Sequence, residues 1–144
     1  MTTRSSEPKM AAPTLPSATI LLVRDVPSGI EVFMVKRHHQ IDFASGALVF
    51  PGGKVDPHDR DPALRDHADG AGELDDYRLS LAACAIREGF EESGILLARK
   101  PGEAGSVTAS MATALADWRP KLNSGDAGLV QFLHTEGLRP VSYT

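Results

Sequence analysis

The order of apolar and polar residues predicts strands in the first part of the chain. Residues 17–24 form a β-branched and aliphatic run that is typical of a buried strand. Residues 25–29 have the composition of a turn, and residues 30–37 predict a second strand that completes a hairpin. A shorter apolar strand at 47–50 leads into a Pro-Gly-Gly loop. We therefore expect a small sheet before any long helix.

Helical spacing of apolar residues begins at residue 79. Residues 79–93 carry a small, mostly apolar face, and Gly94 suits the left-handed position that ends a helix. We expect Ser80 or a neighbour to cap this helix. Gly89 costs about 1 kcal/mol against alanine inside a helix, so we interpret it as a point of close backbone approach.

A short extended run at 95–98 precedes a helical segment over 106–137. This segment predicts two helices. The first covers 106–121 with a core-type stripe of Met111, Leu115 and Trp118, and the second covers 126–136, capped by Asp126 and stopped by Gly137.

Three carboxylates share one face of the helix predicted at 79–93. Glu88, Glu91 and Glu92 have i, i+3 and i+4 spacing, and Arg87 can reach Glu91 at i+4. Like charges so placed repel each other, whereas oxygen donors clustered on a rigid element suit a hard cation such as Mg²⁺ or Mn²⁺. A solvated acidic face is the alternative interpretation.

The string from Arg87 to Ile95, Arg-Glu-Gly-Phe-Glu-Glu-Ser-Gly-Ile, follows an upstream Pro51-Gly52-Gly53-Lys54. Together they resemble the signature of the Nudix hydrolases, which cleave diphosphates joined to another group with Mg²⁺ or Mn²⁺. The resemblance covers about residues 17–99. It implies an α/β (α+β) fold, a Nudix-type α/β/α sandwich with a mixed sheet.

The signature is interrupted between its loop and its helix. Its first acidic position is Asp59 in place of the usual glutamate, and Arg87 arrives much later than the family spacing requires. The chain is similar to a coenzyme A diphosphatase-like branch that carries an insertion here, because Phe50-Pro51-Gly52-Gly53 stands before it and Ala-Ile-Arg-Glu-Gly-Phe-Glu-Glu, residues 85–92, stands after it. The resemblance therefore implies coenzyme A or acyl-coenzyme A as substrate.

The resemblance also implies roles for single residues. Glu88, Glu91 and Glu92 would hold the metal, and Arg87 would orient them. The backbone carbonyl of Gly53 would add a ligand; taken alone, the Gly-Gly pair indicates only a turn. The general base stays unassigned.

A basic cluster ends the second predicted strand, at Lys36-Arg37-His38-His39. One interpretation is a solvated strand end. The other is contact with substrate phosphates by Lys36 and Arg37, together with Lys54 near the Gly-Gly pair. A zinc site at the histidine pair lacks further ligands nearby.

The insertion, residues 57–78, is rich in charge and contains Gly70 and Gly72. It shows no apolar stripe, so we expect a solvated segment whose removal, over 61–76, leaves the domain folded. The alternative is a lid near the metal.

Composition narrows the class of protein. Residues 1–16 predict a disordered tail and 17–144 a single domain. The net charge of −4 gives no indication of nucleic-acid or membrane binding, and no apolar run has the length of a membrane span. The single cysteine, Cys84, falls on the predicted helix as a packing residue and forms no disulfide framework. We expect a cytoplasmic protein.

No convincing strand follows Leu97, although further strands normally follow this helix in the family. We therefore expect a fold that is incomplete at its C-terminal part, with the late apolar residues partly exposed. An uncovered sheet edge would favour homo-oligomers. The alternative to a metal-dependent hydrolase is a truncated or non-catalytic Nudix-like binding module.

Overall fold

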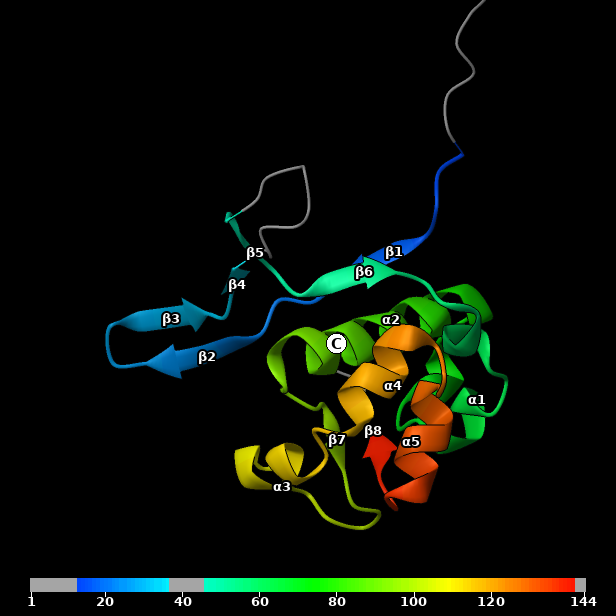
Figure 1. Ribbon diagram of the computed structural model, residues 1–144. Helices are drawn as coiled ribbons and strands as arrows, with labels where there is room; N and C mark the ends of the chain where they lie inside the picture. The colour runs from blue at the N-terminus through cyan, green and yellow to red at the C-terminus, as the bar shows by residue number, and fades with distance from the viewer. Residues whose placement is uncertain (1–12, 37–45, 142–144) are drawn as a thin grey trace, which may run out of the picture.

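A computed structural model of the chain describes residues 13–36 and 46–141. Strands come first and most helices later, as the apolar pattern predicts (Figure 1). The strands are β1 (Ser17–Thr19), β2 (Val23–Val26), β3 (Gly29–Val32), β4 (Val35–Lys36), β5 (Leu48–Val49), β6 (Gly52–Lys54), β7 (Ala98–Arg99) and β8 (Arg139–Pro140). The helices are η1 (Pro57–Arg60), α1 (Leu64–His67), η2 (Ala71–Glu73), α2 (Asp76–Ser93), α3 (Ala109–Ala114), α4 (Trp118–Ser124) and α5 (Leu129–Thr135), where η marks a 3-10 helix.

The long helix α2 is the centre of the molecule. It begins three residues earlier than predicted because Asp75, not Ser80, is its cap: the Asp75 carboxylate accepts a hydrogen bond from the Arg78 amide at 2.7 Å. The predicted end is confirmed, since Gly94 has φ of 75° and its amide donates to the Phe90 carbonyl at 2.8 Å. The carboxylate face is therefore presented by the last two turns of a regular helix.

The expected α+β class is confirmed, but the described strands pair as four two-stranded antiparallel ladders instead of one continuous sheet. The predicted strand at 17–24 is divided into β1, which pairs with β6, and β2, which pairs with β3 in the expected hairpin. The Gly-Gly pair, predicted as a loop, lies in strand β6. Figure 1 shows β1 and β6 lying along α2 while the β2–β3 hairpin extends away from the helices.

The late helices contribute to the core, and the expectation that their apolar residues stay partly exposed is wrong for Leu129 and Phe132, whereas Leu115 and Trp118 are only partly buried. Leu129 and Phe132 have no exposed surface, and the Phe132 ring stacks on Phe90 of α2 with centroids 5.3 Å apart. The Trp118 ring lies 5.1 Å from Phe132. The large exposed apolar side chains lie mainly in the N-terminal strands, including Val23, Ile30, Val32 and Leu48.

Helix boundaries after Leu97 also differ from prediction. The helix predicted at 106–121 is two helices, α3 and α4, and the one predicted at 126–136 is α5, preceded by Gly128 instead of capped by Asp126. Gly137 has φ of 64°, as a stop position requires. A strand not expected from the sequence, β8, pairs with β7.

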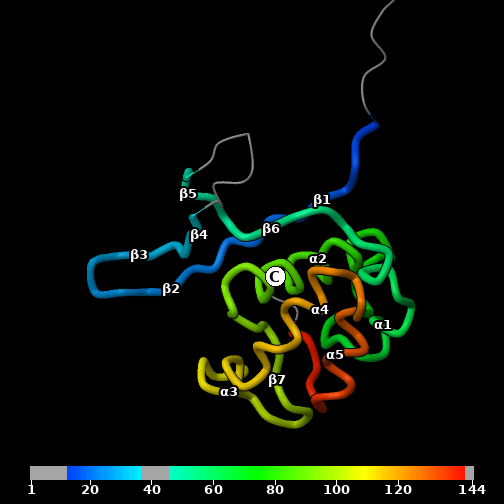
Figure 2. The backbone as a smooth tube through the Cα atoms, in the orientation of Figure 1, coloured from blue at the N-terminus to red at the C-terminus, as the bar shows by residue number. Residues whose placement is uncertain are grey.

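The insertion packs against the core, which corrects the expectation of a solvated segment. Leu64 and Ala71 are each 2% exposed and belong to the same apolar cluster as Phe90. Asp69 is ion-paired with Arg99 of β7 and Arg139 of β8. The chain path in Figure 2 shows this segment folded back beside α2, on the side away from the hairpin.

Some predictions fall outside the described residues. They concern Arg37, His38 and His39 of the basic cluster and most of the tail at 1–16. Among the described helices, none combines the length and the apolar character needed to cross a bilayer.

Candidate functional site

The three carboxylates predicted to share a face do line one cleft. Glu88, Glu91 and Glu92 of α2 form one wall of a depression of about 450 Å³. The opposite wall comes from α4 and the residues just before it, namely Ala116, Arg119, Pro120 and Asn123. The cleft is open and strongly acidic on the α2 side, with one arginine facing it.

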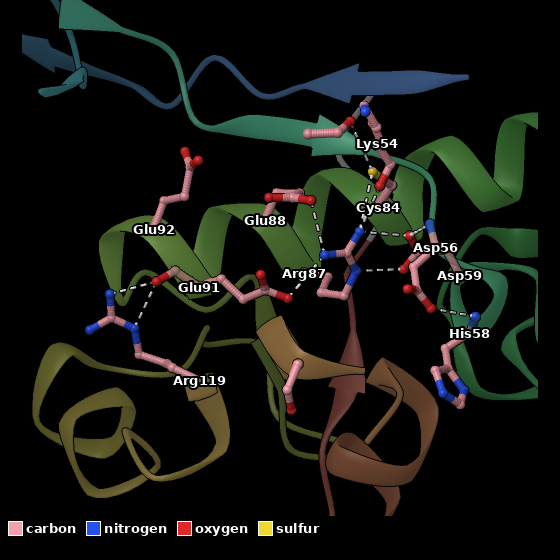
Figure 3. Close-up of polar contacts among 12 residues, drawn as sticks. Lys54, Asp56, His58, Asp59, Cys84, Arg87, Glu88, Glu91, Glu92 and Arg119 are labelled. Atoms are coloured by element: carbon pink, nitrogen blue, oxygen red, sulfur yellow. Dashed lines mark hydrogen bonds and ion pairs between the residues drawn. The ribbon is translucent and has the colours of Figure 1, made fainter. Parts of the chain in front are cut away.

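Arg87 connects these carboxylates to the insertion (Figure 3). Its Nη1 donates to Glu88 Oε1 at 2.9 Å and to Glu91 Oε1 at 3.0 Å, so the predicted i+4 contact is present. Its Nε and Nη2 donate to the two carboxylate oxygens of Asp59, each at 2.9 Å. Arg87 is 5% exposed and Asp59 is fully buried. A bidentate pair at this depth fixes the guanidinium plane.

Asp59 is held in turn by its own 3-10 turn. Its Oδ2 accepts from the Asp56 amide at 2.8 Å, while the Asp56 carboxylate accepts from the His58 amide at 2.8 Å. The Asp56 carboxylate also accepts from the Asp59 amide, and this reciprocal pair of Asp56 and Asp59 is a capping box, which satisfies amides at the start of the turn. Arg87 Nη2 also donates to the Lys54 carbonyl at 3.0 Å. The glycine strand, the insertion and α2 therefore meet at one guanidinium.

Burial changes the acidity of several groups here. Burial raises the pKa of Glu91 above its ordinary value, although Arg87 opposes the shift. Burial alone would lower the pKa of Arg87, but its hydrogen bonds to Asp59 and Glu91 raise that pKa. Burial, with the nearby Asp59 charge, raises the pKa of Cys84 to about 11. A thiol whose pKa is raised in this way stays protonated at neutral pH, which agrees with a packing role for Cys84.

The glycine pair lies against two of the carboxylates, Glu88 and Glu92. The Gly52 amide donates to Glu92 Oε2 at 3.2 Å. A Cβ added at Gly53 would collide with the Glu88 carboxylate, so glycine leaves the space that this carboxylate fills. The Gly53 carbonyl accepts a hydrogen bond from Cys84 Sγ at 3.5 Å, and its ligand role stays a prediction.

The donor chemistry of the cleft fits a hard divalent cation, because three carboxylates from one rigid helix line it. In the described part of the chain, however, no three His, Cys, Asp or Glu side chains converge closely enough to hold a metal ion as they stand. Arg87 engages two of the carboxylates, Glu88 and Glu91. A bound cation would share these oxygens with the guanidinium.

The phosphate contacts expected of Lys36, Arg37 and Lys54 stay predictions. Neither Lys36 nor Lys54 lines the cleft, and Lys36 lies in β4, which pairs with β5. Arg37 is outside the described residues. Sequence reasoning did not find Arg119 and Asn123, because they enter the cleft only through the packing of α4 on α2.

No protein-family model matches the chain. A solved structure, a NUDIX hydrolase from Alicyclobacillus acidocaldarius, aligns with a TM-score of 0.67 and 27% sequence identity over 92% of this chain. The match supports membership of the Nudix superfamily. The chain spans 59% of the length of that Nudix hydrolase. The resemblance of the sequence to the Nudix signature and the similarity of the fold to this structure thus agree.

Proposed function

We propose that this chain hydrolyses a phosphoanhydride bond in a nucleoside diphosphate-linked compound, and that it requires a divalent metal. The observation that carries the proposal is the single cleft lined by Glu88, Glu91 and Glu92, two of which are anchored by the buried Arg87–Asp59 pair. Similarity to a Nudix hydrolase structure supports the same class of reaction.

Each residue has a distinct part in this reaction. Glu88, Glu91 and Glu92 would hold Mg²⁺ or Mn²⁺, which would supply charge neutralisation for the diphosphate and favour ionisation of an attacking water. Arg87 keeps Glu88 and Glu91 turned toward each other, at 2.9 Å and 3.0 Å from its Nη1. Asp59 fixes the plane of Arg87 from the opposite side. Water adds to phosphorus, and one phosphorus–oxygen bond of the anhydride breaks.

We further propose coenzyme A or acyl-coenzyme A as the substrate. The support is the sequence on both sides of the insertion, Phe50-Pro51-Gly52-Gly53 and residues 85–92, which is similar to the coenzyme A diphosphatase-like branch. Lys36, Arg37 and Lys54 are the proposed phosphate contacts. The products would be an adenine nucleotide and a phosphopantetheine compound.

A non-catalytic binding module is the second candidate. The observation in its favour is that Arg87 already occupies Glu88 and Glu91, and that no described group of acidic side chains is arranged around a metal position. Such a module would bind a diphosphate compound without breaking it.

One assay separates the two candidates. The purified chain is incubated with coenzyme A and Mg²⁺ or Mn²⁺, with ADP-ribose as a second diphosphate compound and chelator as the control, and products are separated by chromatography. Metal-dependent cleavage of coenzyme A supports the full proposal, and cleavage of ADP-ribose alone supports the reaction class only. Binding of either compound by calorimetry without cleavage supports the module.

A further inference from the structure

The side chain of Arg119, on helix α4, hydrogen-bonds to the last turn of α2. The guanidinium of Arg119 points back across the cleft, and its Nε and Nη2 both donate to the backbone carbonyl of Glu91, at 3.0 Å and 2.6 Å (Figure 3). Two donors on one carbonyl oxygen define both the position and the direction of that oxygen.

This carbonyl has no partner within its own helix. In a longer helix it would accept from the amide of residue 95, but the Ile95 amide donates to Ser93 Oγ at 3.1 Å and α2 ends at Ser93. Carbonyls of a last turn need partners from outside the helix, and a cation there also compensates the negative end of the helix dipole. Arg119 meets both needs.

Glu91 is consequently held at two places by two different arginines. Arg119 holds its backbone from α4, and Arg87 holds its side chain from α2 itself, at 3.0 Å. The adjacent Glu92, whose carboxylate accepts from the Gly52 amide, belongs to the same turn. Any movement of this turn would move both carboxylates relative to the glycine strand.

We propose that Arg119 is a positioning residue: it fixes the last turn of α2, and with it Glu91 and Glu92, in the arrangement that receives a divalent cation. This inference rests on the proposed function for its chemical meaning. Helix α4 is then the second wall of the cleft in which Glu88, Glu91 and Glu92 would hold the cation.

Three variants test this inference. Arg119→Gln removes the charge and one of the two donors, Arg119→Lys keeps the charge but cannot donate twice in a fixed plane, and Arg78→Gln changes an exposed arginine at the other end of α2. Two quantities are measured. Amide hydrogen exchange reports local order at residues 90–97 without any metal, and electron paramagnetic resonance titration with Mn²⁺ reports metal affinity.

Both Arg119 variants are expected to exchange faster at 90–97 than wild type, with unchanged exchange at the start of α2. Their affinity for Mn²⁺ is also expected to fall by about tenfold or more, which is the usual effect of losing a contact that positions a metal ligand. If Arg119 acted through its charge alone, the pattern would be different. Arg119→Gln would bind Mn²⁺ more strongly than wild type because a nearby positive charge is removed, and Arg119→Lys would bind it like wild type because the charge is kept.

That different pattern, or unchanged exchange in both variants, overturns the inference. So does faster exchange without weaker Mn²⁺ binding, because Arg119 would then only stabilise the fold. If wild type neither binds Mn²⁺ nor cleaves a diphosphate, the proposed function fails. The exchange measurement still decides whether Arg119 fixes this turn.

Discussion

At the scale of single residues, Gly52 and Gly89 differ in whether the space around them could hold a side chain. A Cβ at Gly52 would collide with the backbone of β1 at Ala18 and Thr19. A Cβ at Gly89 would lie 3.6 Å from Ile20 Cγ2, an ordinary van der Waals distance. The interpretation of Gly89 as a close approach of backbone is therefore corrected, whereas Gly52 has that role.

This contrast predicts that Gly89→Ala and Gly52→Ala change the free energy of unfolding in opposite directions. Gly89→Ala should raise the free energy of unfolding by about 1 kcal/mol, because alanine loses less conformational entropy in a helix. Gly52→Ala should lower it, because the β1–β6 ladder must separate to admit the methyl group. Urea unfolding followed by circular dichroism measures both. A destabilised Gly89→Ala would mean that α2 and β1 pack more tightly than the 3.6 Å contact indicates.

The carboxylates give the second residue-scale prediction. Glu91→Gln or Glu92→Gln should lower metal-dependent turnover by roughly two to four decades with little change in fold, since a bound metal contributes several kcal/mol to the transition state and each ~1.4 kcal/mol is tenfold in rate. Glu103→Gln, on an exposed turn outside the cleft, is the matched control. Turnover equal to wild type at saturating Mg²⁺ would remove Glu91 and Glu92 from the metal site.

Single residues also mark how far the sequence predicts the site. The shared face of the carboxylates and the contact from Arg87 to Glu91 follow from helical geometry, because both depend on spacing within one helix. The Asp59 partner lies 28 positions from Arg87, and its contact depends on the folded insertion. The place of Arg119 in the cleft depends on the packing of α4 on α2. Local periodicity contains no information on either of these long-range contacts.

At the scale of elements, the insertion is a structural part of the domain. Leu64 is 2% exposed and packs in the main apolar cluster. Leu64→Ala should therefore lower the free energy of unfolding by about 2–5 kcal/mol, the usual cost of removing a buried leucine side chain. Leu48→Ala, at a position 64% exposed, should change it little. Equal effects of the two substitutions in urea unfolding would restore the expectation that 61–76 is dispensable.

The ion pairs of Asp69 give a pH-dependent prediction for the same element. Hydrogen bonds from Arg99 and Arg139 hold the pKa of Asp69 below its ordinary value. The unfolded chain therefore binds more protons at this site, and the contribution to stability is present above about pH 4 and is lost as pH falls through the lowered pKa. Asp69→Asn should be less stable than wild type at neutral pH.

Wild type and Asp69→Asn should have similar free energies of unfolding at strongly acidic pH. Urea unfolding at neutral and acidic pH measures the convergence, and Asp66→Asn serves as the neighbouring control. A stability difference that stays constant with pH would show that the ion pairs of Asp69 do not contribute through its charge.

Element boundaries show where the sequence pattern is ambiguous. The end of α2 was predictable because Gly94 meets a specific backbone requirement, whereas its start depends on a choice among several capping residues. The strand at 17–24 was predicted as one piece, but the chain leaves the β6 ladder after Thr19 and pairs with β3 from Val23. Pairing partners decide where a strand ends, and an apolar run does not specify its partner.

At the scale of the whole molecule, exposed apolar side chains are concentrated in the β2–β3 hairpin, although the sequence predicted a buried strand over residues 17–24. In the β2–β3 hairpin, Val23 faces Val32 across the ladder and Ile30 shares their face, while Arg24 and Glu31 pair on the other face. Val23 is 62% exposed, Val32 is 44% exposed and Ile30 is 69% exposed. The outer edge of β3 also has no partner strand among the described ladders.

Such a surface predicts self-association of the chain that depends on concentration, because exposed apolar faces and open strand edges both pair with other copies. Sedimentation velocity over a range of concentrations measures this. Ile30→Thr with Val32→Thr should shift the distribution toward monomer, since threonine keeps strand propensity but removes apolar surface. Glu31→Thr, on the opposite face, should not. A monodisperse monomer at every concentration would mean that the exposed face and the open edge of β3 do not bind a second copy.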